Sequence, residues 1–189
     1  MKRTSSNNTF LREQDVYPDY VINNARSLEN VCITDYHNIP LEKWLGEYQL
    51  DVVVPYQLTM MLLKNGKEKL KGIVNISSMY GLLAYNDYLC EGSPAIAINY
   101  GVAKAALVQL TKELAVRLAA DGVRVNAISY GGVSGRTDDT FQQRYARLCP
   151  MHKMLTENEV AGHALYLCSE ASLGMTGQNI VVDGGFSAW

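Results

Sequence analysis

The chain has 189 residues, which is enough for one domain with a substantial core and too few to indicate two. Hydrophobic residues make up 48% of the chain and charged residues 19%, proportions typical of a globular protein and not of a disordered one. The formal net charge of -2 argues against a nucleic acid or an anionic membrane surface as a partner.

The cysteines and histidines indicate neither a disulfide framework nor a metal site. The 4 cysteines lie far apart with no CxxC pair, and the 3 histidines are equally scattered. The first residues are polar and lack an apolar signal core, and no apolar run is long enough to cross a membrane. We therefore expect a cytoplasmic protein without a membrane partner.

The first half of the chain predicts a strand, a long helix and a second strand. Residues 1–19 carry little pattern and are expected to form an irregular N-terminal segment. Residues 20–24 predict a short buried strand that runs into turn-prone asparagines. Pro40 marks a helix start, and the helical period continues to about residue 66, with Pro55 predicting a kink or a break. Residues 72–77 are typical of a strand covered on both faces.

The second half repeats the alternation of strands and helices. Residues 82–99 have no clear period, and so long a connection inside a domain is usually functional. A helix is expected at about 97–120, a strand at 123–128, a helix at 138–148, a capped helix from Thr156 to about 169, and a strand at 179–182. This alternation predicts an α/β fold with a parallel sheet covered on both faces.

Tyr100 and Lys104 lie one turn apart on the same face of the predicted helix at 97–120. A nearby ammonium favours the phenolate form of a tyrosine, which could then exchange protons near neutral pH. By itself, such a pair is more often an ordinary feature of a helix surface, because the pattern is short and both residues are common.

Six blocks in order resemble the short-chain dehydrogenase/reductase family, from about residue 20 to the C-terminus. They are Asn23-Asn-Ala-Arg26, Asn75-Ile-Ser-Ser78, Tyr100-Gly-Val-Ala-Lys104, Val123-Arg-Val-Asn126 with Gly131-Gly132, Thr176-Gly-Gln178 and Val182-Asp-Gly-Gly185. The resemblance implies a Rossmann-like, doubly wound parallel sheet. It also implies hydride transfer between NAD or NADP and an alcohol or carbonyl of a small-molecule substrate.

The resemblance assigns four catalytic positions. Tyr100 would be the acid/base, Lys104 would hold the nicotinamide ribose and favour the phenolate, and Ser78 would hydrogen-bond the substrate oxygen. Asp51 stands where the family has an asparagine. An aspartate can still accept a hydrogen bond and organise a water relay, but it adds a charge.

The resemblance also implies contacts to the cofactor and to the substrate. Cofactor-binding positions, besides Tyr100 and Lys104, are Asn24, Ala25, Gly131 and Val133, the last through its backbone. The stretch between Ser78 and Tyr100 is longer than in the family, and Tyr85, Asn86, Tyr88 and Glu91 in it suit a hydroxyl-rich ligand. Together with Asn23-Asn-Ala-Arg26 and Gly131-Gly132-Val133, this stretch resembles flagellin-modification oxidoreductases of sialic-acid-like sugar biosynthesis. An ordinary surface loop is the alternative for the stretch.

The family's glycine-rich phosphate loop has no counterpart in this sequence, since neither GxxxGxG nor GxGxxG occurs. Residues 20–189 are therefore expected to form a partial Rossmann-like domain that lacks the first βαβ units, as in an N-terminally truncated family member. Two functions stay open: an NAD(P)-dependent oxidoreductase acting on a sugar-like substrate, or a non-catalytic remnant that serves as a binding or assembly subunit. By resemblance, a homodimer or homotetramer is expected.

Overall fold

The computed structural model describes residues 17–31, 38–66, 69–89, 97–135 and 137–189. Its centre is a sheet of four strands in the order β1-β2-β3-β4, all parallel. The strands are β1 (Tyr20–Asn23), β2 (Gly72–Ser78), β3 (Arg124–Tyr130) and β4 (Asn179–Val182). The predicted α/β fold with a parallel sheet is confirmed.

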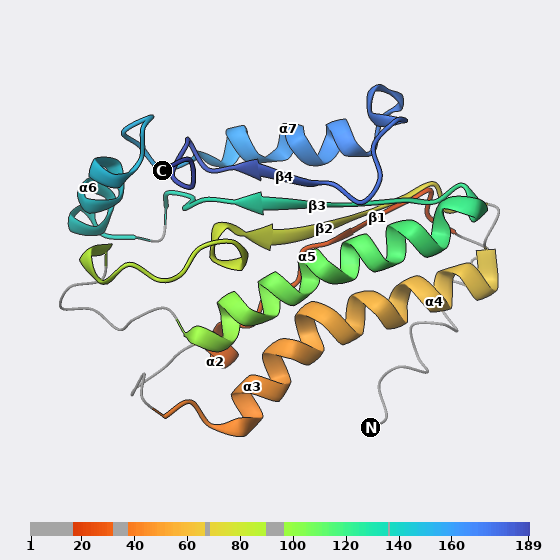
Figure 1. Ribbon diagram of the computed structural model, residues 1–189, viewed down its shortest axis with the longest axis horizontal. Coiled ribbons are helices and arrows are strands. Elements are labelled where there is room, and N and C mark those ends of the chain that lie inside the picture. Colours follow the sequence, from red (N-terminus) through yellow and green to blue (C-terminus); the bar gives the residue numbers. More distant parts are fainter. Residues whose placement is uncertain (1–16, 32–37, 67–68, 90–96, 136) are drawn as a thin grey trace.

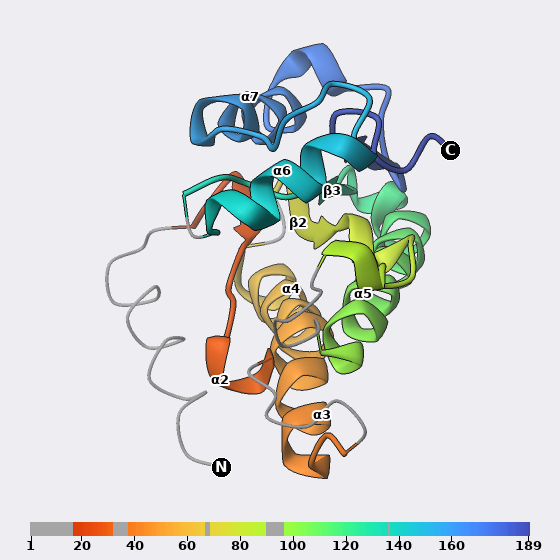
Figure 2. The ribbon, with the colours of Figure 1, turned by 90° about the vertical axis from the view of Figure 1, so that its left-hand side faces the viewer.

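Helices cover both faces of this sheet (Figures 1 and 2). One face carries α4 (Val54–Gly66) and α5 (Ile98–Leu118), and the other carries α7 (Glu157–Leu167). The remaining elements are α2 (Leu28–Val31), α3 (Leu41–Tyr48), a π-helical turn (Gln49–Val53), α6 (Asp139–Leu148) and the 3-10 turns Met79–Gly81, Asp87–Leu89, Ala119–Asp121 and Glu170–Ser172. The carboxyl ends of β2, β3 and β4 point toward the side of the molecule on which α6 lies (Figure 1).

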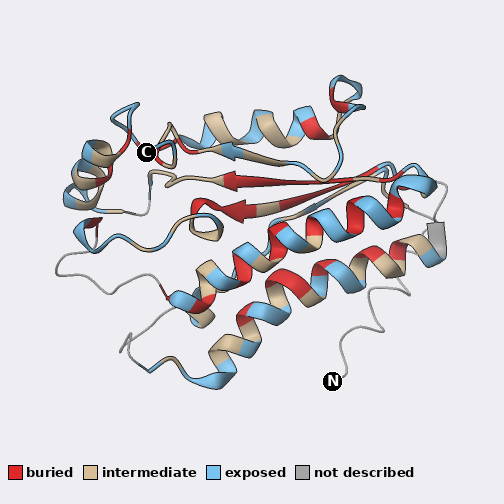
Figure 3. Cartoon of the chain, viewed as in Figure 1, coloured by how far each residue is buried: buried red, intermediate tan, exposed pale blue. Residues whose placement is uncertain are grey.

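The apolar runs of β2 and β3 are explained by burial on both faces (Figure 3). Ile73 and Val125 pack with Leu114 of α5, whereas Val74 and Ile128 pack on the opposite side with α7. Alternate residues of a strand point to opposite faces, so a strand between two helical layers must be apolar throughout.

The helix boundaries follow local signals. Pro40 is the N-cap of α3, and Thr156 forms a capping box with Glu159 at the start of α7. Pro55 does not end the helical stretch; the π-helical turn comes directly before it. There the backbone N–H of Val54 bonds to the carbonyl of Gln49, five residues back. In place of a break, the helical stretch has one wider, π-helical turn, and this turn contains Asp51.

Among the described residues, no helix combines the length and the apolar character needed to cross a membrane. Within the same residues, no three His, Cys, Asp or Glu side chains gather where they could hold a metal ion.

Candidate active site

A cavity of about 1470 Å³ lies at the carboxyl ends of the strands. It is lined by the segment after β1, the end of β2, the first turns of α5, the loop after β3 and the start of α7. Its volume exceeds the roughly 300–1,000 Å³ of ordinary small-molecule sites. Loops at the carboxyl ends of parallel strands converge there, as ligand sites of open α/β sheets do.

Lys104 is held inside this cavity by two acceptors. Its side chain is 8% exposed, and its Nζ donates to Asp51 Oδ1 at 2.9 Å and to the Ile76 carbonyl at 3.1 Å. The same nitrogen lies 5.6 Å from the centroid of the Tyr100 ring. The structure thus brings Tyr100, Lys104 and Asp51 together, whereas their catalytic roles stay a prediction.

Ser78 joins this group through a turn that packs directly on α5. Its Oγ accepts from the Tyr80 N–H at 3.2 Å, and since it accepts here, its own proton can be donated toward the cavity. A Cβ on Gly81 would lie 2.9 Å from the Lys104 backbone, and one on Gly101 would lie 2.9 Å from the Tyr80 carbonyl. Sequence reasoning missed both glycines, which allow the turn to approach the helix that carries the catalytic pair.

Glu47 is a second buried acid beside Asp51, and it was also missed. The two residues are 1% and 4% exposed. Burial raises the pKa of the Asp51 carboxyl, and the Lys104 ammonium opposes that rise. Burial also raises the pKa of Glu47, and the Asp51 charge raises it further. The available signal was a glutamate four residues before Asp51, on the same side of a helical stretch.

Arg26 places a second cation against Tyr100. Its guanidinium carbon lies 5.7 Å from the centroid of the Tyr100 ring, within the range of a cation–π contact. Arg26 stands where the resembling family has a glycine, so its presence was visible in the sequence but its position over the ring was not.

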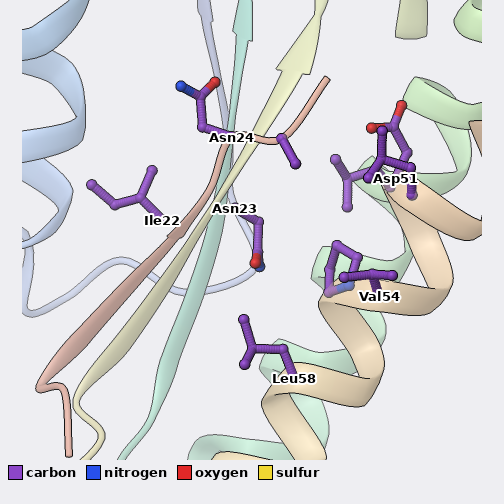
Figure 4. Close-up of a pocket in the computed structure, with 10 residues that line it drawn as sticks. Ile22, Asn23, Asn24, Asp51, Val54 and Leu58 are labelled. Carbon is purple, nitrogen blue, oxygen red and sulfur yellow. The ribbon is translucent and has the colours of Figure 1, made fainter. Parts of the chain in front are cut away.

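Asn24 and Ala25 line the cavity, and a smaller hollow of about 200 Å³ lies beside them (Figure 4). Ile22, Asn23 and Asn24 of the β1 segment stand on one side of the hollow, and Val54 and Leu58 of α4 on the other. Asn23 Nδ2 donates to Asn75 Oδ1 at 2.7 Å, which fixes the end of β1 to β2.

The loop after β3 is shaped by a tyrosine that sequence reasoning did not single out. Tyr145 of α6 is fully buried, and its hydroxyl accepts from the Gly132 N–H at 3.0 Å. A Cβ on Gly131 would lie 2.6 Å from that hydroxyl, so only glycine fits beside it. Burial raises the pKa of Tyr145 to about 12, which keeps it a neutral hydrogen-bonding phenol. Gly131 and Val133 line the cavity, and their contact with the cofactor stays a prediction.

The predicted substrate segment lies beside α6. Tyr88 accepts a hydrogen bond from Arg147 at 2.9 Å, Asn86 accepts from the Tyr88 N–H at 3.0 Å, and Tyr85 packs against the cluster around Tyr145. None of the three is among the described residues that line the cavity. Glu91 lies outside the described residues. The contact of this segment with substrate stays a prediction.

A family model described as enoyl-(acyl carrier protein) reductase matches residues 9–187. The chain belongs to the short-chain dehydrogenase/reductase family. The crystal structure of a short-chain dehydrogenase from Leptospira borgpetersenii with bound NAD+ has a TM-score of 0.89 and 27% identity, covering 98% of this chain and 71% of that one. The Rossmann-like fold is therefore shown by sequence and by structure.

Two relatives of this short-chain dehydrogenase/reductase are named for sugar or protein-modification roles. Galactitol 2-dehydrogenase (L-tagatose-forming) of Cereibacter sphaeroides is 35% identical over 125 residues, 62% of this chain and 46% of the relative. Post-translational flagellin modification protein A of Campylobacter coli is 30% identical over 125 residues, 64% of this chain and 47% of the relative. The chain spans about half the length of these curated relatives.

The donor groups in the cavity fit the nicotinamide half of NAD(P). An ammonium has three donors, and two of those on Lys104 are used by Asp51 and Ile76, so the third is suited to the diol of a ribose. The backbone of the loop at Gly131 and Val133 borders the same space. Neither GxxxGxG nor GxGxxG occurs in the sequence, so no residue is assigned to the pyrophosphate.

Proposed function

We propose that this chain carries the catalytic residues of an NAD(P)-dependent oxidoreductase that acts on an alcohol or carbonyl of a small, sugar-like molecule. The observation that supports this most is the convergence of Tyr100, Lys104 and Ser78 on one cavity, with the Lys104 ammonium fixed by two buried acceptors. Bound NAD+ or NADP+ supplies the hydride acceptor, and the reduced cofactor supplies the hydride.

The protein side chains handle the proton and the oxygen. In alcohol oxidation, Tyr100 as phenolate takes the proton of the substrate hydroxyl, and Lys104 stabilises that phenolate by its charge. Ser78 donates a hydrogen bond to the same oxygen and stabilises the negative charge that develops on it. In carbonyl reduction the proton moves from Tyr100 back to the oxygen.

The sugar-like substrate is supported by the name of the galactitol relative and by several polar residues among those that line the cavity. Asn24, Ser134 and Thr137 line it, and amides and hydroxyls can pair with the hydroxyls of a polyol. The homodimer or homotetramer and the cytoplasmic location are proposed on family resemblance alone.

The test is a cofactor titration of the full chain followed by a turnover assay. Nicotinamide fluorescence would report binding of NADH and of NADPH, and absorbance of the reduced cofactor would report oxidation of galactitol and other polyols. We expect Tyr100→Phe to lower turnover by at least about 10²-fold, because the proton acceptor is gone. Tyr56→Phe on the exposed side of α4 is the matched control.

Two results would contradict the proposal in different ways. Turnover retained in Tyr100→Phe would refute the assignment of the acid/base. Failure of the full chain to bind either cofactor would favour the alternative, a non-catalytic subunit of the same fold.

A further inference from the structure

Glu47 and Asp51 form a pair of buried acids behind the catalytic lysine. Glu47 lies near the end of α3 and Asp51 in the π-helical turn that follows, and they are 1% and 4% exposed. Residues four apart in a helical stretch are neighbours, and the Glu47 carboxyl is within hydrogen-bonding reach of the Asp51 carboxyl. The family asparagine at position 51 would bring no such charge.

The positive charges that face this pair cannot balance two carboxylates. Lys104 of α5 contacts Asp51 at 2.9 Å and is the buried cation of the group. Arg26, from the segment after β1, is exposed. Its positive charge attracts both acids at a distance, without a hydrogen bond to either. From α2, Asn30 gives Glu47 a neutral amide hydrogen bond. With both acids ionised, the buried site would carry one excess negative charge, which a low dielectric disfavours.

Two carboxyl oxygens of the pair also lack hydrogen-bond donors. Glu47 Oε2 and Asp51 Oδ2 are buried and have no hydrogen-bond partner among the described residues. A buried carboxylate oxygen without a donor keeps its full cost of desolvation. One proton held by the pair turns one carboxyl into a donor and leaves the other an acceptor, so that the two acids can hydrogen-bond each other.

We propose that Glu47 and Asp51 share one proton at neutral pH, which is carried by Glu47 and keeps Asp51 a carboxylate against Lys104. The proton belongs on Glu47 because Asp51 is the acid that touches the ammonium. Glu47 is thus a positioning residue, which acts on Tyr100 through Asp51 and Lys104. Its effect on turnover rests on the function proposed above, whereas the shared proton does not.

The shared proton makes stability depend on pH in a defined direction. Burial and the Asp51 charge raise the pKa of Glu47, so the folded chain holds this proton more tightly than the unfolded chain does. Its contribution to stability is complete below the ordinary glutamate pKa of about 4.3. It is lost as the pH rises from there through the raised pKa of the folded state.

Infrared spectroscopy of the unmodified chain tests the proton directly. At neutral pH, where exposed carboxyls are ionised, we expect a carbonyl band of a protonated carboxylic acid. Labelling glutamate with carbon-13 at the side-chain carboxyl should shift that band, and labelling aspartate should not. A spectrum without the band would overturn the proposal, and a shift on aspartate labelling alone would overturn its placement on Glu47.

Stability measured against pH gives a second, independent test. Urea unfolding of the wild type should show a midpoint that falls between about pH 5 and pH 8, whereas Glu47→Gln, which keeps a neutral donor, should remove that fall. Glu42→Gln is the matched control, because Glu42 lies on the same helix and is exposed.

Parallel midpoint curves for the wild type and Glu47→Gln would overturn the proposal. Neither measurement uses cofactor or substrate, so a chain without turnover that still shows the band would refute the proposed function and leave the shared proton standing.

Discussion

Replacing Asp51 with alanine tests whether the buried ion pair is essential for the fold as well as for the chemistry. The side chains of Lys104 and Asp51 are 8% and 4% exposed, and their atoms meet at 2.9 Å. Removing one partner of a buried pair leaves the other charge without compensation, which costs about 3–5 kcal/mol. We expect the lower end, about 3 kcal/mol, because Lys104 keeps the Ile76 carbonyl as an acceptor.

Urea unfolding, followed by tryptophan fluorescence, measures this loss as a lower midpoint at unchanged slope. For a chain of this length, 3 kcal/mol corresponds to a fall in Tm of about 6–12 °C. Asp51→Asn should lose less, because an amide oxygen can still accept from Lys104. The double variant with Lys104→Met should recover part of the loss, since the uncompensated charge is gone. A loss below about 1 kcal/mol for Asp51→Ala would refute the reasoning, because exposed pairs contribute that little.

Three further changes test the supports of the site. Gly101→Ala should lower turnover more than stability, because its Cβ would lie 2.9 Å from the Tyr80 carbonyl and push Ser78 away from Tyr100 and Lys104 on α5. Steady-state kinetics and urea unfolding would measure the two effects. An equal loss of turnover and of stability would indicate a purely structural effect. Tyr145→Phe should cost about 1–3 kcal/mol in urea unfolding, because the Gly132 N–H loses its acceptor at 3.0 Å, and an unchanged midpoint would contradict this. The pKa of Glu159 is lowered to about 2 by Lys153 and by the Thr156 cap, so its stabilisation of α7 is present above the ordinary glutamate pKa and is lost as the pH falls toward 2. In Glu159→Gln, stability measured by urea unfolding should therefore fall less steeply with acid. An acid dependence identical to that of the wild type would contradict this prediction.

Local patterns predicted the fold well because the sheet is buried on both faces. The runs at 72–77 and 123–128 are apolar throughout, and a strand between two helical layers leaves little room for other residues. The capping box at Thr156 and the strand at 179–182 match the observed elements. These signals act over a few residues, so one sequence suffices to detect them.

The placement of Tyr100 and Lys104 on one helix face was predictable for a similar reason, whereas the surroundings of the two residues were not. Tyr100 and Lys104 share one helix, and their spacing already places them on one face. Glu47, Arg26 and Tyr145 reach the same site from three separate elements, and only the packing of those elements brings them together. No periodic pattern in the sequence predicts that these three residues lie at the same site.

The position of Asp51 shows how a local signal can determine a tertiary contact. Pro55 has no N–H for the carbonyl four residues before it, which is that of Asp51, and its ring crowds that carbonyl. The helical stretch accommodates this with the π-helical turn of residues 49–53. A regular helix would rotate the Asp51 side chain to another direction, away from Lys104. The proline therefore contributes to the ion pair without touching it, and Pro55→Ala, by permitting a regular helix, should weaken the contact between Asp51 and Lys104.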